Sequence, residues 1–120
     1  MIHHASFEVS DLDRAGAFYD SVLAPLGWRR QVETDERVGW GIFRPVFFIS
    51  QRRDAAAGGG HVAFAANGIS AVKASWEAGL GAGGLNQGDP GQRPEYGPTY
   101  YAAYLRDLDG HRIEITVGVD

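Results

Sequence analysis

Hydrophobic and polar residues follow two different periods in the first part of the chain. Residues 2–9 (IHHASFEV) alternate between the two kinds, which predicts a strand. Apolar residues then recur at helical spacing from Leu12 to Leu23, and Ser10 is placed to cap the first turn of that helix. Three shorter segments follow and are predicted as strands, at 28–33, 37–43 and 46–51. This order of elements predicts a βαβββ module.

The same pattern restarts after a polar connector, rich in alanine and glycine, at 52–60. A displacement of 57 residues aligns the two halves without a gap and pairs His4 with His61. The segment 86–98 is rich in glycine and proline and is predicted as a loop that holds at most one short strand. The rest of the second half predicts a strand, a helix and two closing strands, at 61–66, 69–80, 99–106 and 111–117.

Together these elements predict a single α+β domain over residues 1–120. It consists of two tandem βαβββ modules, module 1 at about 1–55 and module 2 at about 58–120, whose strands form a cupped mixed sheet with the helices outside. The helices cover one face of the strands. The other face, here named the open face, is expected to line the cup.

Side-chain alternation assigns three metal-capable residues to the open face. The apolar residues of the first strand belong under the helix, which leaves His4, and not His3, on the open face. The same reasoning places His61 and Glu114 there. Two neutral imidazoles and one carboxylate, with positions left open for substrate oxygens, suit Fe(II), Mn(II), Zn(II), Ni(II) or Co(II) acting as a Lewis acid. A histidine at the start of a strand is also a common surface residue, and alternation alone leaves that interpretation open.

Composition narrows the possible functions. Apolar residues make up 44% of the chain and charged residues 22%, as in ordinary globular domains. A net charge of -4 without any basic run argues against a nucleic-acid partner or an anionic membrane surface. The absence of cysteine excludes disulfides, thiolate catalysis and cysteine-based zinc sites. The sequence contains no secretory-signal pattern and no apolar run as long as a membrane helix, so a cytoplasmic protein is expected.

Three segments, HHASFEVSDLDRAGAFYDSVLAPLGW, HVAFAA and DLDGHRIEI, resemble the vicinal oxygen chelate superfamily. This superfamily includes glyoxalase I, extradiol dioxygenases, fosfomycin-resistance transferases and bleomycin-binding proteins. The resemblance spans almost the whole chain and implies metal ligands at the positions of His4, His61 and Glu114. Glyoxalase I has a further glutamate ligand that closes its first module, but the corresponding segment 46–50 (VFFIS) has no carboxylate. The chain therefore resembles the fosfomycin-resistance and dioxygenase branches more than glyoxalase I.

The resemblance also implies that Tyr104 faces the metal, so Tyr104 and Glu114 are the expected catalytic residues. A packed tyrosine with a solvated hydroxyl is the alternative for Tyr104. For Trp40, a place in the core competes with a place on the pocket wall, and His111 is expected on the surface of a turn. Substrate-binding residues are expected on the walls of the cup and over its mouth: Trp40, Phe48, Arg93, Tyr96 and Tyr100.

The leading hypothesis is a metal-dependent enzyme of this superfamily (a lyase or isomerase, a transferase or a dioxygenase) that acts on a small oxygen-rich molecule. A non-catalytic, drug-sequestering protein of the bleomycin-resistance type is the alternative, and the three ligand-type residues count against it. A partner module with a vestigial cup is a third possibility. Short members of the superfamily commonly dimerise, so the resemblance implies a homodimer with shared sites. His4 would come from one chain, and His61 and Glu114 from its partner.

Overall fold

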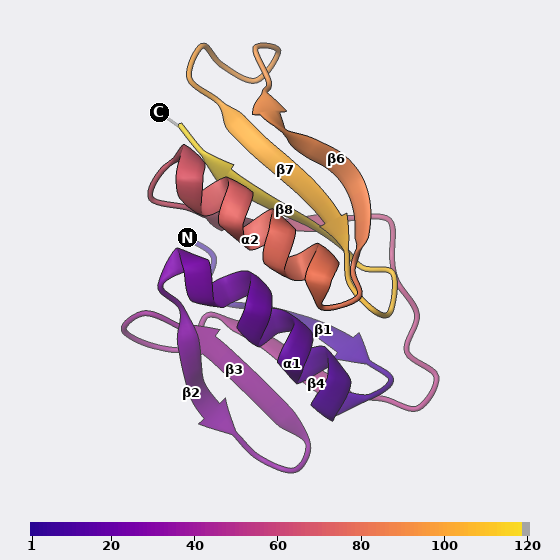
Figure 1. The fold of residues 1–120 in the computed structure, drawn as a ribbon. Helices are drawn as coiled ribbons and strands as arrows, with labels where there is room; N and C mark the ends of the chain where they lie inside the picture. The colour runs from indigo at the N-terminus through magenta and orange to yellow at the C-terminus, as the bar shows by residue number, and fades with distance from the viewer. Residues whose placement is uncertain (119–120) are drawn as a thin grey trace.

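The computed structural model describes residues 1–118, which form two βαβββ modules lying side by side (Figure 1). The predicted α+β class and the internal repeat are confirmed. Module 1 contains β1 (Ala5–Val9), α1 (Leu12–Leu23), the 3₁₀ helix η1 (Ala24–Leu26), β2 (Arg29–Glu33), β3 (Arg37–Gly41) and β4 (Phe47–Gln51). Module 2 contains β5 (His61–Ala65), α2 (Ile69–Gly81), β6 (Leu85–Gln92), β7 (Tyr101–Arg106) and β8 (Arg112–Val117).

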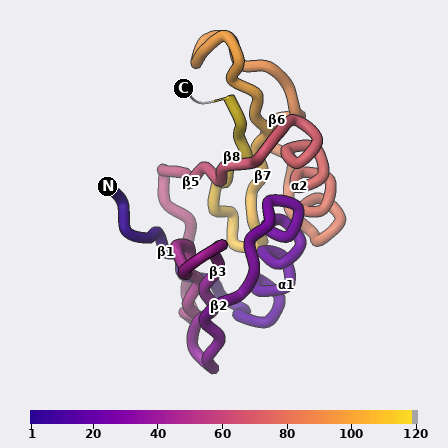
Figure 2. Tube along the Cα trace, turned by 90° about the vertical axis from the view of Figure 1, so that its left-hand side faces the viewer, coloured from indigo at the N-terminus to yellow at the C-terminus, as the bar shows by residue number. Residues whose placement is uncertain are grey.

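Each module builds its own four-stranded mixed sheet. The strand orders are β1-β4-β3-β2 and β5-β8-β7-β6, so the two sheets repeat one topology. The pairs β1–β4 and β5–β8 are parallel, and the remaining pairs are antiparallel. Both helices lie on the same side of the strands, which leaves the opposite side as the open face (Figure 2). Neither helix of residues 1–118 has the length and apolarity that a membrane span requires.

The helix-facing side chains of both modules meet in one core. The ring of Phe64 in module 2 packs edge-on against Phe47 and Trp28 of module 1, with centroids 5.0 and 5.5 Å apart. The helices also approach closely, because the Ser75 hydroxyl donates a 2.7 Å hydrogen bond to the carbonyl of Val22. Burial of these aromatic rings holds the two modules in a fixed relation and thereby places their open faces.

A buried hydrogen bond joins helix α1 to the turn between β7 and β8. The Tyr19 hydroxyl donates to the Asp107 carboxylate over 2.6 Å, and the same carboxylate accepts from the backbone N–H groups of Asp109 and His111. Burial raises the pKa of Tyr19 well above its ordinary value, and the charge of Asp107 raises it further. Burial also raises the pKa of Asp107. This turn residue therefore anchors one module to the other.

His111 does not lie on the surface, and the expectation that it does is wrong. Its ring stacks on Phe7 with centroids 4.2 Å apart, and only 6% of the residue is exposed. Nε2 lies 2.7 Å from the backbone carbonyl of Glu8 and donates to it, since a carbonyl can only accept. A sequence pattern that marks a turn does not show that a second module covers the turn.

The N-cap of helix α1 also differs from the prediction. Asp11, not Ser10, is the N-cap, and its side chain accepts a 3.1 Å hydrogen bond from the N–H of Arg14. Ser10 instead donates both its N–H and its hydroxyl to the carboxylate of Asp109, across the junction between the modules. The helix thus begins at Leu12 as predicted, but Asp11 caps it because the tertiary contact occupies the serine.

Strand β6 is longer than the sequence indicated. It covers Leu85–Gln92, most of a segment that was expected to be mainly loop. Irregular pairing with β7 on both sides of Gly88 accommodates its glycines. The strand forms the outer edge of its sheet, where a proline such as Pro90 removes no needed backbone donor.

We expect Tyr19→Phe to lower the free energy of unfolding by about 1–3 kcal/mol, because the buried Asp107 carboxylate loses its hydroxyl donor. Since the pKa of Tyr19 is raised in the folded state, its stabilising contribution is complete below its ordinary pKa of 10.0 and is lost as the pH rises beyond it. Thermal melts between pH 7 and 11 measure both effects. Tyr96→Phe, at an exposed residue, is the control and should change stability by less than about 0.5 kcal/mol.

Candidate metal centre

The open face of module 2 brings a histidine and a glutamate into contact. His61 begins β5, and Glu114 lies on the adjacent strand β8, opposite Ala63. Nε2 of His61 lies 2.9 Å from Oε1 of Glu114. The Glu114 residue is only 4% exposed, whereas the His61 side chain is 50% exposed. A nearly buried carboxylate oxygen and an accessible imidazole nitrogen therefore point at the same place.

Tyr100 holds the second oxygen of this carboxylate. Its hydroxyl donates a short hydrogen bond to Oε2 of Glu114. Burial raises the pKa of the Tyr100 phenol, and the bond to Glu114 raises it further, so the phenol keeps its proton at neutral pH. Because Oε2 is held by Tyr100, Oε1 is the oxygen presented beside His61. This is the usual way in which an outer residue orients a metal-binding carboxylate.

Tyr104 stands directly opposite Glu114 in the register between β7 and β8. Burial raises its pKa, and the charge of Glu114 adds to the shift, so Tyr104 is a neutral phenol at physiological pH. The guanidinium of Arg93 lies over its ring, 5.4 Å from the centroid, and is tied to the carbonyl of Asp89. Tyr96 is exposed and packs edge-on against Tyr100 at 5.4 Å. Tyr100 and Tyr104 thus lie beside the carboxylate, and Tyr96 and Arg93 pack on these two tyrosines.

His4 lies on the open face of module 1, apart from the pair in module 2. Its ring packs edge-on against Phe48 at 5.5 Å, and its Nδ1 lies 2.9 Å from Nδ1 of His3. Both His4 and His61 line a cavity of 320 Å³ between the two modules. Within residues 1–118, no three histidine, aspartate or glutamate side chains are close enough to hold one metal ion. A single chain therefore brings together two of the three expected ligands.

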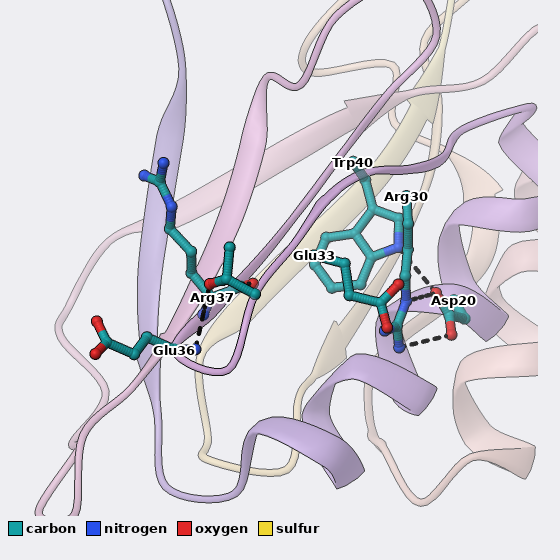
Figure 3. Close-up of polar contacts among 7 residues, drawn as sticks. Asp20, Arg30, Glu33, Glu36, Arg37 and Trp40 are labelled. Atoms are coloured by element: carbon teal, nitrogen blue, oxygen red, sulfur yellow. Dashed lines mark hydrogen bonds and ion pairs between the residues drawn. The ribbon is translucent and has the colours of Figure 1, made fainter.

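Trp40 does not line the site. Its side chain is fully buried under α1, and its indole N–H donates a 3.0 Å hydrogen bond to Asp20. Figure 3 shows Trp40 beside Arg30 and Asp20, with Arg37 extending away from this group. The placement contradicts a role for Trp40 on the pocket wall and matches the competing expectation of a core residue. Its parity along β3 explains this, because Trp40 shares a face with buried Val38.

The same parity exposes Arg37, a residue that no metal-ligand pattern in the sequence selects. Arg37 lies on the open face, and its guanidinium is 5.3 Å from the centroid of the Phe48 ring. The only signal in the sequence is side-chain alternation, which places Arg37 on the face of the strand opposite Val38 and Trp40. Metal-ligand chemistry alone gave no reason to select it.

The donors present in module 2 fit a divalent transition metal. An imidazole nitrogen and a carboxylate oxygen are the ligand types that Fe(II), Mn(II), Zn(II), Ni(II) and Co(II) share. Tyr100 supplies the outer hydrogen bond that such carboxylates usually have. The half-exposed His61 leaves room for further ligands from another source.

Comparison with known structures identifies the family. A glyoxalase/bleomycin resistance protein from Albidiferax ferrireducens is 32% identical, with 94% of each chain covered and a TM-score of 0.81. The chain belongs to the glyoxalase/bleomycin resistance family. This confirms the resemblance to the vicinal oxygen chelate superfamily. No family model and no curated protein sequence matches the chain significantly.

Two more distant members of this superfamily share the fold. A glyoxalase-related enzyme from Fulvimarina pelagi is 19% identical over 96% of this chain and 86% of its own, with a TM-score of 0.76. The fosfomycin resistance protein FosX from Mesorhizobium loti is 22% identical over 97% of this chain and 90% of its own, with a TM-score of 0.71. At these identities the likeness concerns the fold, and the chemistry of this family member must be argued from its own residues.

Proposed function

We propose that this protein is a metal-dependent enzyme acting on a small, oxygen-rich molecule, with His61 and Glu114 as two of its metal ligands. The observation that carries the proposal is the contact between the exposed His61 imidazole and the nearly buried Glu114 carboxylate. A carboxylate with one oxygen fixed by Tyr100 and the other directed at an imidazole is an arrangement suited to binding a cation. The family includes proteins whose names refer to glyoxalase activity and to drug resistance.

The residues around the pair have separate tasks in this proposal. When bound, a divalent ion supplies a Lewis acid for substrate oxygens. His61 and Glu114 hold it, and Tyr100 keeps Glu114 oriented. Tyr104 stands beside Glu114 as a neutral phenol, so it is suited to donate a hydrogen bond or a proton to a substrate oxygen that gains negative charge. Its raised pKa makes it a poor base at neutral pH.

The third ligand in the proposal is His4 of a second copy of the chain. Within one chain His4 packs against Phe48 and does not reach His61 and Glu114. A homodimer that faces module 1 of one protomer with module 2 of the other supplies the missing histidine twice, once for each site. This arrangement also covers the open faces, which no helix covers in the monomer (Figure 2).

A Co(II) titration of wild type, His4→Ala and His3→Ala, followed by visible absorption, tests the ligand assignment. We expect His4→Ala to lower the apparent Co(II) affinity by at least about tenfold, because a ligand is lost. His3→Ala should lower it less, because His3 is not a proposed ligand and only packs beside His4, with the two Nδ1 atoms 2.9 Å apart. A larger loss in His3→Ala would contradict the assignment. Failure of the wild type to bind Co(II) would instead favour the metal-free, small-molecule-binding alternative.

A further inference from the structure

The open face of module 1 carries a group of three packed side chains, one of which is the proposed metal ligand His4. The Arg37 guanidinium lies over the ring of Phe48, 5.3 Å from its centroid. The ring of His4 packs edge-on against the same Phe48 at 5.5 Å. An arginine, an aromatic ring and a histidine thus follow one another across the face, and the ring lies between the other two.

The internal repeat shows which position Phe48 occupies. Ser6 on β1 pairs with Phe48, and the equivalent residue Ala63 on β5 pairs with Glu114. Phe48 is therefore the module 1 counterpart of Glu114. Where module 2 presents a carboxylate beside its histidine, module 1 presents an apolar ring beside His4.

The neighbouring strand is shaped around this ring. Gly39 on β3 stands opposite Phe48, as Tyr104 stands opposite Glu114 in module 2. A Cβ atom at Gly39 would come within 2.6 Å of the Phe48 ring, so any larger residue would push the ring away. The glycine lets the ring lie close over β3, where the Arg37 guanidinium also contacts it, and Phe48 remains partly exposed.

Among residues 1–118, Arg29, Arg37, Arg44 and Arg53 near this sheet form no ion pair, and of these four only Arg37 lies over an aromatic ring. Arg30 pairs with Asp20 at 2.9 Å, and Arg52 pairs with Asp54 and Glu8 at 3.0 and 3.3 Å. Among residues 1–118, no carboxylate forms an ion pair with Arg37. A guanidinium that is oriented by an aromatic ring but has no anionic partner is well placed to receive an anionic group.

We propose that Arg37 and Phe48 form a substrate subsite that binds an apolar group bearing an anionic oxygen group, such as a carboxylate or a phosphonate. The apolar part packs on the Phe48 ring, and the anionic oxygens pair with Arg37. The subsite rests on the proposed function, because its place beside His4 sets a substrate next to the metal. The subsite implies a small substrate with an apolar part and an anionic group. The metal ligands alone do not specify these two features.

The test measures binding of phenylphosphonate by isothermal titration calorimetry, on the full chain as purified and again after chelation. Benzyl alcohol, which lacks the charge, and methylphosphonate, which lacks the ring, are the matched probes. We expect Arg37→Gln to weaken phenylphosphonate binding about tenfold in both forms of the protein, as loss of a charge-assisted hydrogen bond does. Binding of benzyl alcohol should stay the same. Arg37→Lys should give an intermediate loss, because lysine keeps the charge but not the planar stack.

Arg52→Gln is the matched control, since it removes an arginine near the same sheet that already has partners. Equal affinities of wild type, Arg37→Gln and Arg52→Gln for phenylphosphonate would overturn the subsite, and so would the absence of binding by the wild type. Arg37 is exposed, and melting curves will show that the variants remain folded. Because the measurement after chelation needs no metal, failure of the subsite and failure of metal binding are separate results.

Discussion

Glu114→Gln is expected to lower the affinity for Mn(II) or Zn(II) by about 100-fold or more. Loss of a residue that only hydrogen-bonds to a metal ligand already lowers metal affinity by about 10–100-fold. Glu114 is proposed as a direct ligand, so its loss should have at least the larger of these effects. Glutamine has nearly the same shape as glutamate but is a neutral and much weaker ligand. It can still accept the hydrogen bond from Tyr100, so the loss of affinity reports on the removed charge and not on a collapsed strand.

Equilibrium dialysis with elemental analysis measures this effect, and Glu77→Gln is its matched control. Glu77 is an exposed carboxylate on helix α2, on the side of the strands opposite the open face. Its replacement should leave metal affinity within about twofold of wild type, as expected for a surface carboxylate away from the site. Similar losses in the two variants would show that the metal responds to the general negative charge of the protein and not to one site.

Mixing two variants that each bind metal weakly should restore tight metal binding. His4→Ala and Glu114→Gln each lack one ligand, so neither homodimer has a complete site under the shared-site proposal. In a heterodimer, one of the two sites receives His4 from the Glu114→Gln chain, and His61 with Glu114 from the other chain. Random reassortment makes half of the dimers heterodimers, so about a quarter of the wild-type metal capacity should return.

The mixture is made by unfolding and refolding the two variants together, and the metal bound per chain is compared with that of separately refolded samples. If the mixture binds no more than its components, the ligands do not combine across chains. Light scattering on the wild type provides the companion measurement. A monomer at micromolar concentration would remove the basis for shared sites.

Much of the fold followed from periodicity, because strands and helices bury their apolar faces in different ways. The 57-residue displacement also relates the two helices, because α1 begins at Leu12 and α2 begins at Ile69. Parity along the strands also separated residues of the open face, such as His61, from residues of the core, such as Phe64. These features depend on local backbone geometry, which a single sequence reports well.

The errors occurred where one module contacts the other. Ser10 lost its capping role because Asp109 of the other module binds it, and His111 is buried because β1 covers it. The distance between His4 and the pair in module 2 depends on how the modules dock, and no alternation pattern reports that distance. Strand β6 was underestimated because its glycines and its proline resemble a loop unless the edge position is known.

The two modules have diverged in a way that fits one site built from both. Module 2 carries the carboxylate and its tyrosines, whereas module 1 carries Phe48 at the corresponding place, with the Arg37 guanidinium over its ring. In the proposed dimer, the polar face of module 2, which is proposed to bind the metal, would lie opposite the apolar and cationic face of module 1. A substrate held between them would be fixed at one end by the metal ligands and at the other by Arg37.

The most direct test of the metal centre is a crystal structure of Co(II)-loaded protein with anomalous scattering data collected at the cobalt edge. We expect one anomalous peak per chain, beside Nε2 of His61 and Oε1 of Glu114, with His4 of a second protomer completing the protein ligands. An anomalous peak elsewhere, or none at this pair in protein that is otherwise folded, would contradict the metal centre.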